Sequence, residues 1–331
     1  MRRTTGLGLI GILALAGCGS GSSSTSGSPA EPTTAVTASR GACSADVTVA
    51  NLGVTGAAAM VLGVDKGLFK DNGLNVTLKD TAAASTQAAV VSGAAQFAYT
   101  NVPAVLAASS NGLPVRVVAA ANAFARKGKE SNIVVMAKGD SGIKTVKDLA
   151  GKKVAVDTLF QLPHLSLIEA AQSAGVDPKS FKVSEIPFPA MIEAMDRGQV
   201  DAADVTEPFR TIAKRMGYVE VVPNNDGVSD GAVQGVWVTS ADFANKSPDV
   251  VACFQKSVAE ANRYATAHED EVRTITPTFT KTPPELASVI LFPTFDATVD
   301  KGSFESYAKT MKDNGILKKD VNLGQLIVAQ P

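Results

Sequence analysis

Two distant segments share a pattern of alanine and glycine that predicts the same turn twice. Residues 89–98 (AVVSGAAQFA) align with residues 194–203 (AMDRGQVDAA), with alanine, glycine, a polar residue and alanine at equal offsets. In each segment a helical pattern ends at glycine, which accepts the left-handed conformation at a helix C-terminus, and a strand pattern follows. Gly73 and Gly175 mark an earlier helix end in each half. The chain is therefore predicted to contain two copies of one βαβαβ module.

Short apolar segments alternate with amphipathic ones elsewhere, which favours an α/β fold with mainly parallel sheets. In the first half, strands and helices are expected in turn over 46–51, 57–69, 74–78, 86–92, 96–100, 103–110 and 115–120. In the second half, strands are expected near 154–156, 182–186 and 202–205, before a mostly helical part over 248–315. The apolar, extended segments 132–137 and 233–239 are interpreted as crossovers between two lobes, which makes the second lobe an insertion.

The first residues have the pattern of a secretory signal peptide. Arg2 and Arg3 precede an apolar stretch from Leu7 to Ala16 that is too short to span a bilayer as a stable helix. The run Leu15-Ala16-Gly17-Cys18 resembles a bacterial lipobox, in which the cysteine is acylated and becomes the first mature residue. We expect residues 1–17 to be a lipoprotein signal peptide and Cys18 to be a lipid anchor that holds the chain outside the cytoplasm. The alternative is an ordinary signal peptide that happens to contain a cysteine.

Composition sets the limits of the folded part. Residues 18–42 are rich in Gly, Ser, Thr, Ala and Pro, so a flexible tether is expected after the lipidated cysteine. About 290 residues follow from Cys43, which suits two lobes better than one small core. We expect lobe 1 to comprise residues 43–132 plus 239–331, and lobe 2 to be the inserted segment 133–238.

Charge and cysteine use narrow the partners. Without Arg2 and Arg3, 29 Lys and Arg remain against 32 Asp and Glu, and the absence of a basic run excludes nucleic acid as a natural partner. An exported location permits Cys43 and Cys253 to form a disulfide, and two unpaired cysteines are the alternative. A monomer is expected.

Several motifs resemble one family of binding proteins. Residues 58–76, with Gly67-Leu68-Phe69 and Asn72-Gly73-Leu74, resemble the opening of ABC-transporter solute-binding proteins of the nitrate, sulfonate, taurine and thiamine-precursor group. The segments that agree with it over about residues 46–270 are 93–98, 148–156, and 198–203 running into Glu207-Pro208-Phe209. Gln96 departs from the pattern, because the family usually carries an acidic residue there.

The resemblance implies an α/β, two-lobe periplasmic-binding-protein type II fold with a ligand cleft between the lobes. Such a protein captures a small organic solute, here a sulfonate, heterocycle or similar molecule, by hinge closure and delivers it to a permease. Its partners would be the ABC permease and ATPase subunits. No cofactor is implied.

Candidate solute contacts are polar residues that directly follow strands or begin helices, where free N–H groups favour anions and carbonyl oxygens. The ten predicted ligand-binding residues are Thr55, Ser85, Thr86, Thr100, Asn101, Thr158, Gln161, His164, Thr206 and Glu207. Ser, Thr and Asn also occupy helix caps without any ligand, so only about half of the candidates on lobe 1 are expected to touch solute.

Four residues have competing interpretations. Glu207 could accept hydrogen bonds from an amine or ring N–H of the solute, or stabilise its own helix as a first-turn carboxylate. His164 could be a ligand contact or a satisfied surface histidine. Trp237 could stack on an aromatic solute, although a core position is favoured. Arg126 could bind a sulfonate, but its lysine neighbours favour a solvated loop.

The motifs do not support catalysis. The chain has two histidines, no cluster with metal-ligand spacing, no Gly-x-Ser-x-Gly elbow and no phosphate loop. Two alternatives to transport stay open. One is an enzyme of the same fold acting on pyrimidine precursors, which would need reactive His or Cys residues in the cleft. The other is a tethered sensor that binds solute without transporting it.

Overall fold

A computed structural model describes residues 43–126, 128–224, 229–295 and 298–330. The predicted signal peptide, the lipid anchor at Cys18 and the tether over 18–42 lie outside the described residues. Within the described ranges, none of the helices combines the length and apolarity that a membrane span requires.

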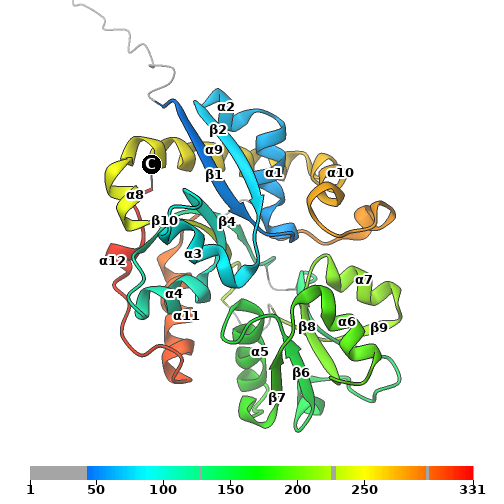
Figure 1. The fold of residues 1–331 in the computed structure, drawn as a ribbon. Coiled ribbons are helices and arrows are strands. Elements are labelled where there is room, and N and C mark those ends of the chain that lie inside the picture. The colour runs from blue at the N-terminus through cyan, green and yellow to red at the C-terminus, as the bar shows by residue number, and fades with distance from the viewer. Residues whose placement is uncertain (1–42, 127, 225–228, 296–297, 331) are drawn as a thin grey trace, which may run out of the picture. The chain divides into compact units, whose positions relative to one another are not determined.

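The described chain is built around two five-stranded mixed sheets with the same strand order (Figure 1). The first sheet runs β2 (Leu74–Asp80), β1 (Ala45–Asn51), β3 (Phe97–Asn101), β10 (Val233–Ser240) and β4 (Val115–Ala123). The second runs β7 (Lys182–Glu185), β6 (Lys153–Val156), β8 (Ala202–Thr206), β5 (Ile133–Lys138) and β9 (Tyr218–Pro223). In each sheet the fourth strand of this order, β10 or β5, is antiparallel to its neighbours. We call the parts built on these sheets the first and second lobes.

Helices cover the faces of both sheets and connect their strands (Figure 1). The α-helices are α1 (Ala58–Asp65), α2 (Leu68–Asp71), α3 (Thr86–Val91), α4 (Val102–Ser110), α5 (Leu162–Ser173), α6 (Phe188–Asp196), α7 (Phe209–Arg215), α8 (Ala241–Lys246), α9 (Pro248–Ala267), α10 (Glu269–Phe279), α11 (Lys301–Asp313) and α12 (Leu323–Leu326). The short 3-10 helices are η1 (Thr55–Ala57), η2 (Ala83–Ser85), η3 (Val146–Leu149), η4 (Pro178–Ser180) and η5 (Pro284–Val289). The helix predicted over 57–69 is divided into α1 and α2, because Gly67 adopts a left-handed φ of 77° between them.

The internal repeat of the sequence corresponds to a repeat in the structure. The path β1-α1-β2-α3-β3 of the first lobe matches β6-α5-β7-α6-β8 of the second, strand for strand. Gly93 and Gly198, the aligned glycines, follow α3 and α6 with φ values of 77° and 67°. A residue with a Cβ would be strained in that conformation, so glycine allows each helix to end and the next strand to begin.

The return to the first lobe lies earlier in the chain than we expected. Residues 233–238, which the sequence assigned to lobe 2, form most of β10, and β10 pairs with β3 and β4 inside the first sheet. Every residue of β10 is buried, and among the described residues the strand pairs only with strands of the first sheet, so β10 belongs to the first lobe. The lobe boundary is therefore better drawn before Val233.

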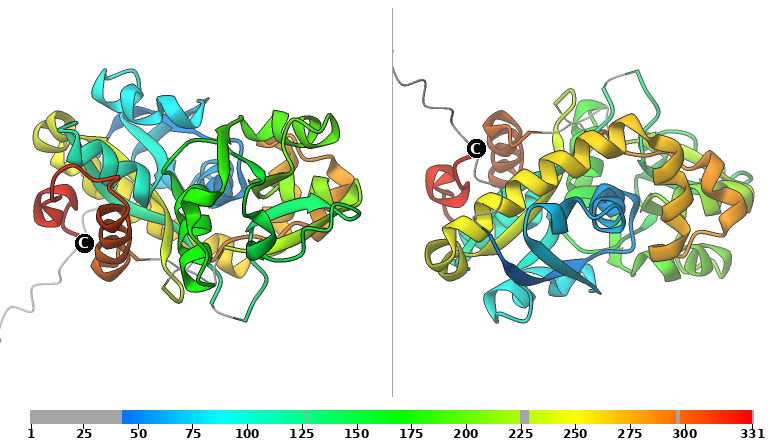
Figure 2. Two further views of the ribbon diagram at one scale, coloured as in Figure 1. Left: turned by 90° about the horizontal axis from the view of Figure 1, so that it is seen from below. Right: turned by 90° about the horizontal axis from the view of Figure 1, so that it is seen from above.

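Part of the first-lobe core is built around α9, which packs against α1 and extends across the lobe (Figure 2, right). Val251, Phe254, Val258, Ala261 and Ala265 are spaced three and four residues apart, so they share the buried face of this helix. Cys253, on the same helix, forms a disulfide with Cys43 just before β1. The disulfide therefore links two segments of the first lobe.

The central strands of the second sheet are buried on both faces. Along β5, Val134 and Met136 pack into one apolar cluster, whereas Val135 and Ala137 pack into another. Successive side chains of a strand point to opposite faces, so a strand covered by helices on both sides is apolar throughout. This explains the continuous apolar run that the sequence analysis interpreted as a crossover.

Candidate functional site

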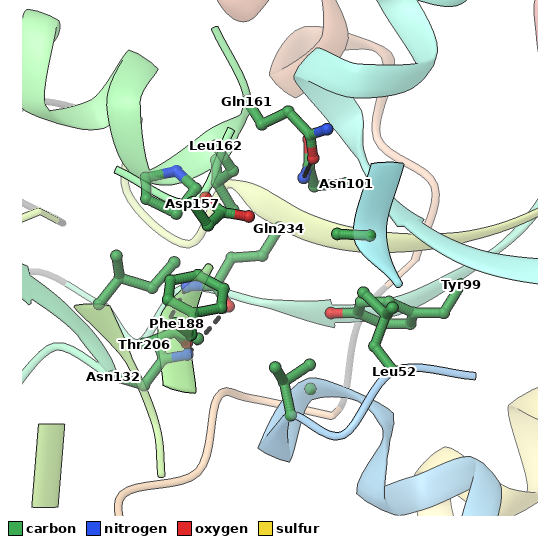
Figure 3. A pocket seen from close by; sticks show the side chains of 15 residues that line it. Leu52, Tyr99, Asn101, Asn132, Asp157, Gln161, Leu162, Phe188, Thr206 and Gln234 are labelled. Atoms are coloured by element: carbon green, nitrogen blue, oxygen red, sulfur yellow. Dashed lines mark hydrogen bonds between the residues drawn. The ribbon is translucent and has the colours of Figure 1, made fainter. Parts of the chain in front are cut away.

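A cavity lies between the two lobes, with walls from both sheets (Figure 3). The described residues that line this inner cavity are Leu52, Val54, Gly56, Ala83, Tyr99, Asn101, Asn132, Ile133, Asp157, Gln161, Leu162, Pro163, Phe188, Thr206 and Gln234. Its volume is about 60 Å³. A larger outer cavity of about 620 Å³ shares Leu52, Val54, Ala83, Asp157 and Phe188 with it. The two are therefore parts of one cleft.

The lining follows from sheet topology. The parallel strands β1, β2 and β3 of the first lobe, and β6, β7 and β8 of the second, all end at this cleft. In open α/β sheets, ligands bind outside the carboxyl ends of the strands. Because the lobes repeat one module, the same edge of each sheet supplies each wall.

Asp157 is an ionisable residue of this cleft, and one oxygen of its carboxylate is unsatisfied. It follows β6 directly, and its Oδ1 is buried without a hydrogen-bond donor among the described residues. Burial raises the pKa of Asp157 to about 7, even though hydrogen bonds with Thr158 lower it. The negative charge of Glu185 raises the pKa further. Figure 3 shows the carboxyl group pointing into the cavity.

Tyr99 presents its hydroxyl group from the first lobe (Figure 3). Its oxygen accepts a hydrogen bond from Asn122 at 3.0 Å, which leaves its own proton available to a solute. Burial raises the pKa of Tyr99 to about 12, so the hydroxyl stays protonated at neutral pH. A Cβ at Gly56 or Gly235 would lie 2.3 or 2.5 Å from this oxygen. Glycine at both positions therefore makes room for the hydroxyl.

A reciprocal amide pair joins the two chain segments that pass between the lobes. Gln234 on β10 donates to Asn132 at 2.9 Å, and Asn132 donates back at 3.4 Å. The backbone carbonyl of Asn132 also accepts the N–H of Glu207 at 2.9 Å. Both amide side chains line the inner cavity, so the floor of the cleft coincides with the interlobe connection (Figure 3).

A second polar contact bridges the lobes at the inner cavity. Asn101 caps the N-terminus of α4 by accepting the N–H of Ala104 at 2.9 Å, and it donates to Gln161 of the second lobe at 2.9 Å. The Asn101 side chain therefore caps α4 of the first lobe and also bonds to Gln161 on the second-lobe wall of the cleft.

Replacing Asn101 with alanine is expected to lower the free energy of unfolding by about 1 kcal/mol, because the cap of α4 is lost. Asn101→Ser is the matched control, since serine also caps helices but is too short to replace the bond to Gln161. Urea denaturation measures both variants. Equal losses for Ala and Ser would show that the interlobe bond, and not the cap, carries the effect.

The structure brings some of the predicted residues to the cleft and leaves others away from it. Asn101, Gln161 and Thr206 line the inner cavity, and Thr158 lines the outer one. The predicted residues outside both linings are Thr55, Ser85, Thr86, Thr100, His164 and Glu207.

Four of these outlying residues lie on the first lobe. Thr55 is buried between two lining residues, and its hydroxyl has no hydrogen-bond partner in the described chain. Thr86 donates to Ala83 of its own turn, and Thr100 accepts from Gln87 of α3. Ser85 is exposed and makes no cap hydrogen bond. Thr86 and Thr100 are therefore occupied by local structure.

His164 is buried in the first turn of α5. Its Nδ1 accepts the backbone N–H of Phe160 at 3.0 Å, and its ring stacks on that phenylalanine. Burial lowers the pKa of His164 to about 4, so the ring is neutral at physiological pH. It is a satisfied histidine, as one of the two interpretations held, but a buried one.

Glu207 departs most clearly from its predicted role. It is fully buried, and its Oε1 accepts hydrogen bonds from Arg210, Thr211 and the backbone N–H of Leu291. Its Oε2 accepts the N–H of Thr211. Burial raises the pKa of Glu207, and these hydrogen bonds and the Arg210 charge lower it. The carboxylate stabilises its own helix and fastens it to the segment around Leu291, and it lies outside the lining of the cleft.

Trp237 and Arg126 take the positions that the sequence analysis favoured. Trp237 is 1% exposed and packs edge-on against Tyr99 and Phe254 in the first-lobe core. Arg126 is largely exposed and pairs with Asp230. Neither residue lines the cleft.

Sequence reasoning missed several lining residues, including Asp157, Tyr99, Asn132, Phe188 and Gln234. Asp157 could have been found, because it directly follows a predicted strand. Tyr99 lies inside β3, and Gln234 lies inside β10, where sequence position gives no sign of a cavity. No group of His, Cys, Asp and Glu side chains suited to a metal ion occurs in the described ranges.

Comparison with known proteins gives one family match. The family model described as "NMT1/THI5 like" matches residues 54–272. The chain is also 30% identical over 213 residues to the taurine-binding periplasmic protein of Escherichia coli (strain K12). That alignment covers 64% of this chain and 64% of the relative, which is less than two thirds of the length of either.

Two solved structures are similar in fold. The ligand-binding component of an ABC-type import system from Staphylococcus aureus has a TM-score of 0.73 at 15% identity, covering 86% of this chain and 96% of that one. The alkanesulfonate-binding protein SsuA from Xanthomonas axonopodis pv. citri has a TM-score of 0.72 at 15% identity, with 86% and 98% covered. These likenesses confirm the predicted α/β, two-lobe periplasmic-binding-protein fold.

Proposed function

Because the chain belongs to the NMT1/THI5-like family, we propose that it is the extracytoplasmic solute-binding lipoprotein of an ABC importer. It captures a small organic solute, such as a sulfonate or a heterocycle, and delivers it to the permease and ATPase subunits. The observation that carries this proposal is the cleft lined from both lobes. The similarity to a taurine-binding periplasmic protein supports the same class of activity.

The cleft suits capture by closure. A ligand shifts the equilibrium between open and closed states only by as much as it binds one state better than the other. A solute that contacts Asn101 on the first lobe and Thr206 on the second gains both contacts only when the lobes are close together. Binding then requires no bond to be made or broken, and the solute leaves unchanged.

A thermal-shift screen of the purified protein tests this function. The panel contains sulfonates, thiamine precursors, riboflavin-like compounds and inorganic anions. A tight solute present at a hundred times its dissociation constant stabilises the folded state by about 2.7 kcal/mol, so the midpoint should rise. Uptake of that solute should fail in cells that lack the gene. Conversion of the solute by the purified protein, or normal uptake without the gene, would contradict the proposal.

The lipid anchor gives a separate prediction. Replacing Cys18 with alanine removes the thiol that would be acylated, so the protein should move from the membrane fraction to the soluble fraction. Labelled palmitate should be incorporated into the parent protein and not into the Cys18→Ala variant. Affinity for solute should be unchanged, because Cys18 is not one of the described residues that line the cleft. Equal membrane association of both proteins would contradict the anchor.

A further inference from the structure

We propose that the solute carries a cationic nitrogen, which Asp157 receives, and an apolar body that packs between the two lobes. This inference rests on the proposed solute-binding function and specifies its substrate class. Its starting point is the carboxylate oxygen of Asp157, which is buried at the cleft and has no donor among the described residues. A buried acceptor without a partner is costly, and an N–H group of a ligand would satisfy it.

The charges of the cleft favour a cation. Among the fifteen described residues that line the inner cavity, Asp157 alone is charged. The outer cavity adds Asp80 and Lys281, and no arginine of the described ranges lines either part. Recognition of a sulfonate or carboxylate commonly uses the forked donors of arginine. The innermost charge of this cleft is instead negative.

The surroundings of Asp157 reinforce the negative field. Asp204 on β8 is fully buried and accepts two hydrogen bonds from Asn224. Burial raises the pKa of Asp204 well above its usual range, so this carboxyl group adds little negative charge. Glu185 at the end of β7 acts on Asp157, while His164 on the adjacent α5 is neutral. A cation placed at Asp157 is therefore attracted by the Asp157 carboxylate and by the charge of Glu185.

The rest of the cleft suits an organic body. Leu52, Val54 and Phe188 line both parts of the cleft, and Phe209 and Phe279 line the outer part. The outer volume of about 620 Å³ falls in the range of organic-ligand pockets and far exceeds the space that a small inorganic anion needs. A ring or short alkyl chain can therefore pack against Phe188 while its nitrogen faces Asp157.

Three compounds that have nearly the same shape but different net charges test the inference. Benzamidinium is a cation, benzamide is neutral and benzoate is an anion, and all three carry the same ring. Isothermal titration calorimetry of the purified protein at pH 8 should show benzamidinium binding at least tenfold more tightly than benzamide, with benzoate the weakest. Asp157→Asn should lower benzamidinium affinity at least thirtyfold and leave benzamide affinity within about threefold. Asp140→Asn, at an exposed site of the second lobe outside the cleft, is the control of equal charge and should change neither.

Stability of the unliganded protein provides a second measurement. The pKa of Asp157 is raised to about 7 in the folded state, so the folded protein loses stability as the pH rises from about 4 to above 7. Asp157→Asn should therefore raise the thermal midpoint at pH 8 while it weakens benzamidinium binding. A lower midpoint would assign Asp157 a purely structural role and overturn the inference.

The raised pKa of Asp157 also predicts how benzamidinium binding depends on pH. The ionised form of Asp157 receives the cation, so benzamidinium affinity should fall as the pH drops through 7, by nearly tenfold per unit well below it. Benzamide affinity should change little over this range. A flat profile for benzamidinium would overturn the inference.

The outcomes separate this inference from the proposed function. Taurine and nitrate are included as additional ligands. Tight binding of taurine, nitrate or benzoate that is unchanged or stronger in Asp157→Asn overturns the inference and leaves the solute-binding function intact. A failure of benzamidinium to bind more tightly than benzamide also overturns it. If no compound of this series or of the wider screen binds, both the inference and the proposed function fail.

Discussion

Replacing Glu207 with alanine is expected to lower the free energy of unfolding by about 3 kcal/mol, with little direct effect on solute contacts. The substitution removes a fully buried carboxylate that accepts hydrogen bonds from Arg210, Thr211 and the backbone of Leu291. Buried donors without an acceptor are costly, so the loss exceeds that of the hydrogen bonds themselves. The magnitude lies at the low end for a broken buried ion pair, because Arg210 keeps ion pairs with Glu130 and Glu220.

Chemical denaturation of the variant measures this loss. Glu193→Ala is the matched control in the same lobe, since Glu193 forms an exposed i,i+4 pair with Arg197 and should change stability by less than about 0.5 kcal/mol. A Glu207→Ala protein of unchanged stability and much weaker solute binding would contradict the structural role. It would restore Glu207 as a ligand contact.

Removing the disulfide is expected to lower the free energy of unfolding by about 4 kcal/mol. The Cys43–Cys253 bond joins residues 210 positions apart, so it restricts the unfolded chain over most of the folded part. The constraint on an unfolded chain grows with the length of the loop that a disulfide closes. The bond also holds the start of β1 against α9, next to the aromatic cluster around Phe254.

Alanine variants of the two cysteines measure the effect by denaturation under non-reducing conditions. Cys43→Ala alone, Cys253→Ala alone and the double variant should all lose nearly the same stability, because any one of them prevents the bond. The parent protein treated with reductant should approach the same value. A loss of less than about 1 kcal/mol in the double variant would contradict the expected contribution.

The fold could be predicted largely from local patterns. The glycines at 93 and 198 end equivalent helices, and their repetition correctly indicated one module used twice. The strand positions within the two modules followed from apolar segments of the right length. In contrast, β9 was not predicted, and β5 and β10 were interpreted as crossovers. The division of the helix at Gly67 and the assignment of residues 233–238 were harder, because sheet membership depends on pairing with β3 and β4, which lie far away in the sequence.

The site could be predicted in position but not in detail. Thr100 and Asn101 are neighbours on β3, yet only Asn101 reaches the cavity, since successive side chains of a strand point to opposite faces. The orientation of each residue was not apparent from its place at the end of the strand. Glu207 was among the predicted ligand contacts, yet three of the four hydrogen bonds to its carboxylate come from Arg210 and Thr211 of its own helix. The fourth comes from Leu291, which lies 84 residues away. No local pattern in the sequence indicates that contact.

Labels on the two lobes test most directly the claim that solute is held between them. Lys79 on β2 and Glu193 on α6 are exposed positions on opposite lobes, and cysteines there can carry a fluorescence donor and acceptor. For every compound that raises the thermal midpoint, we predict that titration shifts the distance between the two labels to a shorter value. This shift should occur at the same compound concentration as the rise of the midpoint. A compound that binds tightly while the distance distribution stays unchanged would contradict it.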